Sequence, residues 1–147
     1  MTATTDFAHL RSALPFWISL LTVPLMMIAA VVGGWAVLLP PLFTWVLFDI
    51  LDTALGVDEA NADTDTPEDE LYWHRMVTLV WFPVQFLLLC WLLWYVPQAP
   101  HLGPLEKIVL FFGMGIIAGA VGIVYAHELM HQKHRLERWL ADLWLGT

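Results

Sequence analysis

Long uncharged runs, separated by short polar segments, dominate the pattern of this chain. Between Arg11 and Asp49 there are 37 consecutive residues without a charge. One helix of that length would extend about 56 Å, nearly twice the hydrocarbon thickness of about 30 Å in a bilayer. The run must therefore fold back on itself, and Gly33-Gly34 is where we expect the reversal. This pattern predicts two membrane helices, over about 14–32 and 35–51.

Two further uncharged runs predict two more crossings. Met76 to Pro97 contains 22 residues, and the preceding Thr66-Pro67 supplies an N-cap and a first helical residue. Ile108 to Ala126 contains 19 residues and continues without a helix breaker into the polar C-terminal segment. The sequence therefore predicts an all-α membrane protein with four transmembrane helices in a single membrane domain over 1–147. The third and fourth helices are expected over about 67–96 and 108–140, and an acidic loop over 52–66.

The fourth predicted helix is rich in small residues. Gly115 and Gly119 form a G-x-x-x-G pair, and Gly113 and Gly122 lie nearby. Such pairs let helix backbones approach closely in membranes. The pattern predicts that this helix packs closely against a partner helix.

Composition and charge agree with a membrane protein. The chain is 59% hydrophobic and 14% charged, whereas soluble domains have about 45–50% apolar and about 25% charged residues. Nine of the acids lie in 49–75 with a single base, Arg75, so most of the net charge of −8 belongs to one segment. A chain of this charge is not suited to a nucleic-acid partner. The one cysteine, Cys90, excludes an internal disulfide.

The basic residues predict the orientation. With a cytoplasmic N-terminus, only Lys107 would lie on the outer side of the membrane. The other five bases would lie inside, as the positive-inside rule requires. They are Arg11, Arg75, Lys133, Arg135 and Arg138.

The candidate chemistry lies at the end of the fourth predicted helix. His127 and His131 are four residues apart, so they share one helical face and can bind the same metal ion. Glu128 lies between them, which gives the spacing His-Glu-x-x-His. Helical geometry also admits His134 to this face.

The spacing alone leaves three interpretations open. In zinc proteases the glutamate of this motif is the general base. In histidine-rich membrane oxygenases and desaturases, several such motifs from different helices hold iron. The third possibility is a non-enzymatic membrane protein with an interfacial histidine pair. The sequence contains no obvious third ligand, so it cannot complete either metal centre alone.

Two segments resemble the membrane-bound alkane monooxygenases. The stretch from His127 to Lys133, with Arg135-Leu136-Glu137-Arg138-Trp139-Leu140-Ala141 after it, is similar to the first histidine box of that family. Leu51-Asp52-x-x-Leu55-Gly56-x-Asp58-x-x-Asn61, after the second predicted helix, is similar to the family's segment at the same place. This second segment favours the alkane branch over desaturases and aryl-methyl hydroxylases.

The resemblance implies a fold and a metal site. Family members have six membrane helices, and their later histidine boxes complete a non-haem di-iron site. The chain is therefore expected to be the N-terminal part of such an enzyme and to be inactive alone. By position, His127 and His131 are the implied iron ligands, and Glu128 is a hydrogen-bonding partner of a ligand. His134 falls where relatives do not require histidine.

The resemblance also implies a reaction and a location. The reaction is terminal hydroxylation of an n-alkane by dioxygen, with electrons from rubredoxin, in a bacterial inner membrane. An alkane has no polar group that could form a hydrogen bond, so apolar side chains must align it by shape. Trp17, Trp45 and Phe86 are the candidate residues for such a substrate channel within the lipid bilayer.

Overall fold

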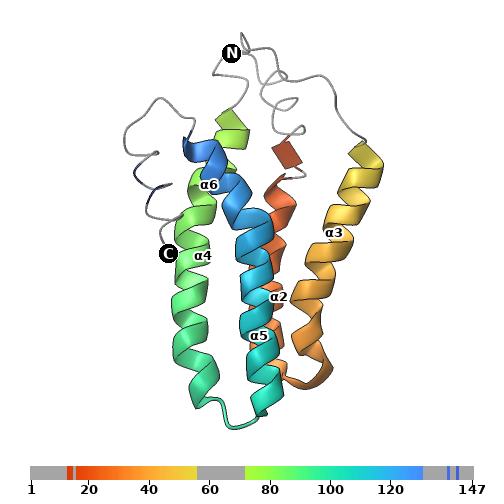
Figure 1. Ribbon diagram of the computed structural model, residues 1–147, viewed down its shortest axis with the longest axis vertical. Coiled ribbons are helices and arrows are strands. Elements are labelled where there is room, and N and C mark those ends of the chain that lie inside the picture. The colour runs from red at the N-terminus through yellow and green to blue at the C-terminus, as the bar shows by residue number, and fades with distance from the viewer. Residues whose placement is uncertain (1–12, 15, 56–71, 131–138, 140–141, 143–147) are drawn as a thin grey trace.

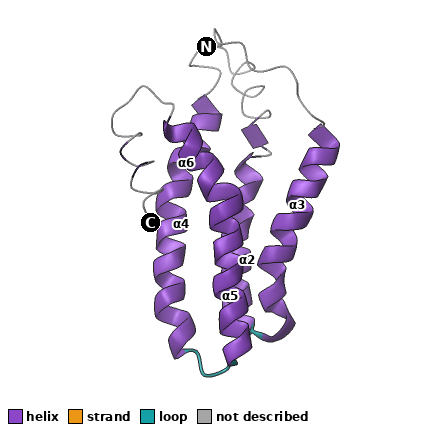
Figure 2. Cartoon of the chain, viewed as in Figure 1, coloured by secondary structure: helices purple, strands orange, loops and turns teal. Residues whose placement is uncertain are grey.

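The computed structural model describes residues 13–14, 16–55, 72–130, 139 and 142, and this part of the chain is helical apart from short turns (Figures 1 and 2). A 3-10 turn, Ile18–Leu21, leads into α2, Thr22–Val32. A second 3-10 segment, Gly34–Leu38, leads into α3, Leu39–Leu55. The remaining helices are α4 (Tyr72–Gln98), α5 (Pro104–Ile117), a π-helical segment (Ala118–Gly122) and α6 (Ile123–Met130).

These helices form a bundle of two hairpins. The turn between α2 and α3 and the turn between α4 and α5 lie at the same end (Figure 1). At the opposite end, α6 lies beside the beginning of α4, and these two helices are in contact. Helices α2 and α5 each contact the other three of the helices α2, α3, α4 and α5.

Two of the described helices are long and apolar enough to cross a membrane. The first is α4, Tyr72–Gln98, with mean hydropathy 2.1. The second is the continuous helical stretch Pro104–His127, which contains α5, the π-helical segment and the first part of α6 and has mean hydropathy 2.4. Only 33% and 39% of their apolar windows are buried inside the protein, so most of this apolar surface faces outward, as contact with lipid requires. The segments Ile18–Val32 and Gly34–Val46 are shorter apolar helices.

Buried hydroxyl and amide groups within the bundle have hydrogen-bond partners in the protein. Thr44 donates from Oγ1 to the carbonyl oxygen of Pro40 at 2.8 Å. Trp81, which is fully buried, donates from Nε1 to Oε1 of Gln85 at 2.5 Å. Internal partners of this kind are necessary at membrane depth, because no water is available to replace them.

The chain reverses at Gly33-Gly34, as the sequence predicts, with φ of 69° and 58°. Contacts from the second hairpin hold this turn. The Glu106 carboxylate accepts the backbone N–H of Gly34 and that of Gly103, the latter at 2.5 Å. His101 Nε2 lies 3.1 Å from the carbonyl oxygen of Ala30. The contacts of Glu106 with Gly34 and of His101 with Ala30 join the two turns, and the Gly103 bond holds Glu106 in place. We refer to the three together as the hairpin clasp.

Replacing Gly33 by alanine is expected to destabilise the bundle. Its φ of 69° and ψ of −161° lie in a region that only glycine adopts readily, and forcing another residue there costs about 1–3 kcal/mol. An added Cβ would lie 3.1 Å from Cδ2 of Leu102 and 3.3 Å from Oε1 of Glu106. Gly115→Ala is the control, because its Cβ would meet no atom of the described residues within 4 Å and alanine favours a helix. Unfolding in mixed detergent micelles measures both variants, and equal stability would contradict this account of the turn.

The close helix packing lies at a different glycine from the predicted pair. A Cβ at Gly115 or Gly119 would meet no described atom within 4 Å, so this pair faces open space in the described part of the chain. At Gly113 a Cβ would lie 3.4 Å from Met26 Cε and from Pro41 Cδ. Close approach by α2 and α3 therefore occurs on the predicted helix, at the neighbouring Gly113 and not at the G-x-x-x-G pair itself.

Candidate metal centre at the end of helix α6

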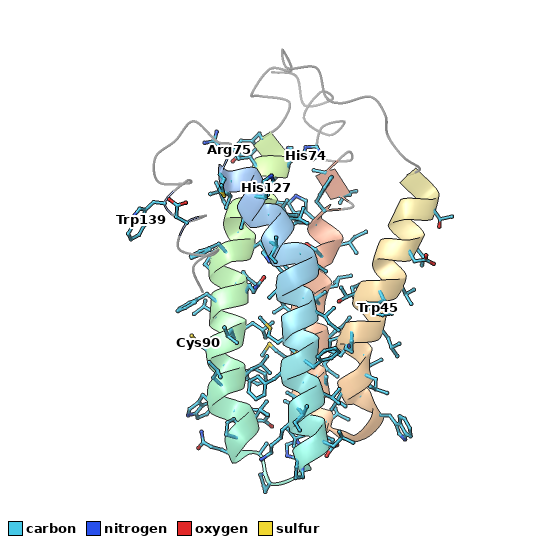
Figure 3. The ribbon with its side chains drawn as sticks, viewed as in Figure 1. Trp45, His74, Arg75, Cys90, His127 and Trp139 are labelled. Carbon is cyan, nitrogen blue, oxygen red and sulfur yellow. The ribbon has the colours of Figure 1, made fainter. Side chains whose placement is uncertain are left out.

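His127 is exposed and lies in the last turn of α6. His74 and Arg75, in the first turn of α4, lie at the same end of the bundle (Figure 3). This end is opposite to the hairpin clasp. A candidate metal ligand, His127, thus lies exposed at the end of the apolar helical stretch Pro104–His127.

Only part of the predicted site can be located. His131 and His134 lie outside the described residues, and the side chain of Glu128 does too. Within the described ranges, no three histidine, cysteine, aspartate or glutamate side chains gather closely enough to hold a metal ion. The exposed imidazole of His127 suits iron or zinc as a donor, but it is a single described donor and does not form a site alone.

A cluster around the buried Tyr125 anchors the helix that carries His127. The Tyr125 hydroxyl donates to the carbonyl oxygen of Phe16 at 3.0 Å and lies 3.1 Å from Oγ of Ser19. The ring of Tyr125 packs edge to face on Trp81 of α4, with ring centroids 5.9 Å apart. We call Phe16, Ser19, Trp81 and Tyr125 the tyrosine anchor. It fixes α6 both to residues 16–19, which precede α2, and to α4.

This anchor was not predicted from the sequence. The sequence feature that could have indicated it is the presence of two hydroxyl residues, Ser19 and Thr22, inside an uncharged run. A polar side chain in such a run needs a hydrogen-bond partner. Thr22 bonds locally to the carbonyl oxygen of Ser19 at 2.7 Å, whereas Ser19 reaches Tyr125, 106 residues away. Sequence alone cannot distinguish these two outcomes.

The π-helical segment lies directly before α6. A π turn contains about one residue more than an α turn, and such segments are frequent at functional sites. One extra residue rotates the following side chains by about 100° around the helix axis. The small residues of Ala118–Gly122 allow this geometry, which sets the faces on which Tyr125 and His127 lie.

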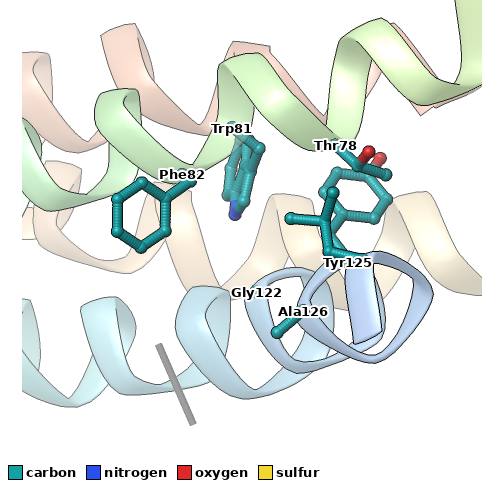
Figure 4. Close-up of a pocket in the computed structure, with 7 residues that line it drawn as sticks. Thr78, Trp81, Phe82, Gly122, Tyr125 and Ala126 are labelled. Atoms are coloured by element: carbon teal, nitrogen blue, oxygen red, sulfur yellow. The ribbon is translucent and has the colours of Figure 1, made fainter. Parts of the chain in front are cut away.

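A small apolar cavity lies between α4 and α6, beside the place where the two helices are in contact (Figure 4). Its volume of about 10 Å³ is close to that of a single water-sized sphere. Trp81 and Phe82 line it from α4, and Tyr125, Ala126 and Leu129 line it from α6. The helix that carries His127 is therefore packed on α4 with little free space beneath it.

Comparison with curated proteins finds alkane 1-monooxygenases. Alkane 1-monooxygenase 1 of Pseudomonas aeruginosa is 35% identical over 101 residues, which cover 67% of this chain and 26% of that protein. Alkane 1-monooxygenase 2 of the same organism is 29% identical over 104 residues, 69% of this chain and 28% of that protein. Alkane 1-monooxygenase 1 of Alcanivorax borkumensis is 29% identical over 103 residues, 69% of this chain and 25% of that protein.

The chain belongs to the alkane 1-monooxygenase family. The resemblance predicted from the two motifs is thereby confirmed. The chain spans about a quarter of the length of these curated relatives. No protein-family model matches it, and no solved structure matches it.

The three aromatic residues predicted to line a substrate channel, Trp17, Trp45 and Phe86, lie on different segments of the bundle. Trp45, on α3, is 69% exposed, and Phe86, on α4, is 53% exposed. These two helices lie on opposite sides of the bundle (Figure 1). Trp17 is partly buried and donates from Nε1 to the carbonyl oxygen of Trp73 at 3.3 Å. The channel they were expected to form stays a prediction.

Proposed function

We propose that this chain is part of an alkane 1-monooxygenase that hydroxylates the terminal carbon of n-alkanes with dioxygen. The observation that carries the proposal is the similarity of about two thirds of the chain to three proteins of that name. The apolar helices support it, because an alkane partitions into the bilayer and must be bound there.

We propose His127 and His131 as iron ligands of a non-haem di-iron site. Their spacing of four residues places both imidazoles on one face if the helix continues beyond Met130. Iron would supply the dioxygen-activating chemistry when bound. The remaining ligands would come from other parts of the complete enzyme, which in the relatives is about four times as long as the aligned segment.

The other residues near the pair have supporting roles in this proposal. Glu128 accepts a hydrogen bond from a ligand imidazole and so fixes its tautomer. The tyrosine anchor holds the helix at a constant rotation, which keeps the imidazole of His127 aimed at the metal. The apolar packing of Ala126 and Leu129 against α4 excludes water from beneath the site.

Electrons are proposed to come from rubredoxin. Rubredoxins are generally acidic, and the segment after Met130 contains the bases Lys133, Arg135 and Arg138. Complementary charge of this kind accelerates the encounter of two proteins and makes it depend on salt. The acidic loop, by contrast, would repel such a donor.

We propose a topology of four crossings with both described hairpin turns outside and both chain ends in the cytoplasm of a bacterium. The complete enzyme would add two further helices. Reporter fusions at Gly34 and His101 are expected to report the outer side, and fusions at Asp63 and Thr147 the inner side. An outer signal at Asp63 would overturn the four-crossing topology.

The experiment for the function uses the complete enzyme purified from membranes. We expect iron in excess of zinc, and octanol from octane when rubredoxin and its reductase supply electrons. The His-Glu-x-x-His spacing also fits a membrane zinc metalloprotease. Zinc in place of iron, with no octanol above a no-enzyme control, would favour that second function and reject the first.

A further inference from the structure

At the clasp end of the bundle, opposite to His127, an apolar hollow opens beside the two turns. It lies between the 3-10 segment Gly34–Leu38 and the first turns of α5, and its volume is about 330 Å³. Pockets that bind small ligands usually have volumes of about 300–1,000 Å³. Leu38, Leu105 and Val109 supply apolar side chains to its walls. We call it the α5 hollow.

One carboxylate interrupts these apolar walls. Glu106 lines the α5 hollow, and its two oxygens accept the N–H groups of Gly34 and Gly103. A carboxylate has about four lone-pair sites, so each oxygen can accept a further hydrogen bond. The adjacent Lys107 directs its ammonium elsewhere, because Nζ donates to the carbonyl oxygen of Pro97 at 3.0 Å.

The rim of the α5 hollow suits the membrane interface. Trp35 is 88% exposed and Leu105 is 72% exposed. The hollow lies at the beginning of the apolar stretch Pro104–His127, where a helix that spans a bilayer would meet the lipid headgroups. An exposed indole at this depth favours an ammonium group, through attraction of the cation to the ring face.

We infer that the α5 hollow binds a phospholipid with a primary ammonium headgroup, of the phosphatidylethanolamine class. The apolar walls accommodate part of an acyl chain, while the ammonium donates to the remaining lone pairs of Glu106 beside Trp35. Charge complementarity selects this occupant. An alkane offers nothing to the carboxylate, phosphatidylglycerol lacks a cation, and the quaternary ammonium of phosphatidylcholine has no N–H to donate.

Photolabelling of the whole chain tests this inference. The protein is placed in phosphatidylcholine nanodiscs with a phosphatidylethanolamine that has a diazirine in its acyl chain, and labelled residues are mapped by peptide mass spectrometry. We expect labels in 34–38 and 104–109. Unlabelled phosphatidylethanolamine is expected to displace the probe about tenfold more effectively than phosphatidylglycerol, the change that one charge-assisted hydrogen bond produces.

Two variants test the parts of the site separately. Val109→Phe fills the hollow and keeps the carboxylate, so labelling of both segments should be lost. Ile108→Phe is its matched control, because Ile108 is 65% exposed on the same helix and does not line the hollow. Glu106→Gln removes the charge and keeps only one of the two acceptor oxygens at the clasp. It should reduce displacement by phosphatidylethanolamine to the level of phosphatidylglycerol.

Three results would overturn the inference. Equal displacement by phosphatidylglycerol would remove the role of the ammonium. Equal displacement by hexadecane would make the hollow a hydrocarbon site. Undiminished labelling in Val109→Phe would place the lipid elsewhere. A loss of the helical circular dichroism signal in Glu106→Gln would show that this variant fails to fold. In that case lipid competition on the unmodified chain, and the comparison of Val109→Phe with Ile108→Phe, still test whether the hollow binds the lipid.

Discussion

Replacing His127 or His131 by alanine in the complete enzyme is expected to remove bound iron and nearly all alkane hydroxylation. Each change deletes an imidazole nitrogen that water replaces poorly. Loss of a residue that merely supports a ligand typically costs about 10–100-fold in activity, so we expect a ligand variant to lose at least about 100-fold. The exposure of His127 at the end of α6 means that the fold should survive its replacement.

His134→Ala is the matched control for these variants. It is the same change on the same predicted helical face, and it should retain most of the iron and activity. Glu128→Gln should retain some iron and partial turnover, because a supporting hydrogen bond is weakened rather than a ligand lost. Iron content and octanol formation are measured at equal membrane levels. Full activity in His131→Ala would reject the ligand assignment. A loss of iron and activity confined to His134→Ala would mean that the assigned pair, His127 and His131, is wrong.

Replacing Trp81 by alanine should have the largest effect on stability. The side chain is 1% exposed, between α4 and α6, and its removal leaves a cavity beside the existing small one. Substitutions of buried aromatic residues by alanine cost about 3–5 kcal/mol. The change also removes the partner of Gln85 and the edge-to-face contact with Tyr125, so the helix that carries His127 should loosen.

Trp94→Ala provides the comparison for Trp81. It is the same change on the same helix, but Trp94 is 64% exposed, so the expected change in stability is within about 0.5 kcal/mol. The free energy of unfolding in mixed detergent micelles measures both variants. Equal losses would show that α4 is not packed as described.

The sequence predicted helical structure because long uncharged runs leave few alternatives in a membrane. The reversal at Gly33-Gly34 was also predictable, since the first run is too long for one crossing and only these residues tolerate positive φ there. The hairpin clasp was not predictable. It depends on Glu106 reaching Gly34, 72 residues away, and a lone glutamate before an apolar run indicates only a capping role at its own helix.

The candidate site was predicted less completely than the helices. Spacing identified His127 as chemically interesting, and the structure places it at an exposed helix end. The tyrosine anchor that orients this helix depends on Tyr125 meeting Ser19 across the bundle. Such pairs arise from helix rotation, which the π-helical segment alters by a fraction of a turn. Periodicity calculated for a regular α-helix cannot anticipate that rotation.

The hairpin clasp also has a consequence for biogenesis. Its bonds from Gly34 to Glu106 and from Ala30 to His101 span 72 and 71 residues, so they cannot form within either hairpin alone. The first hairpin is synthesised earlier, and its turn at Gly33-Gly34 must wait for the second hairpin to supply the carboxylate. Closure of the clasp therefore requires both hairpins to lie side by side in the correct register.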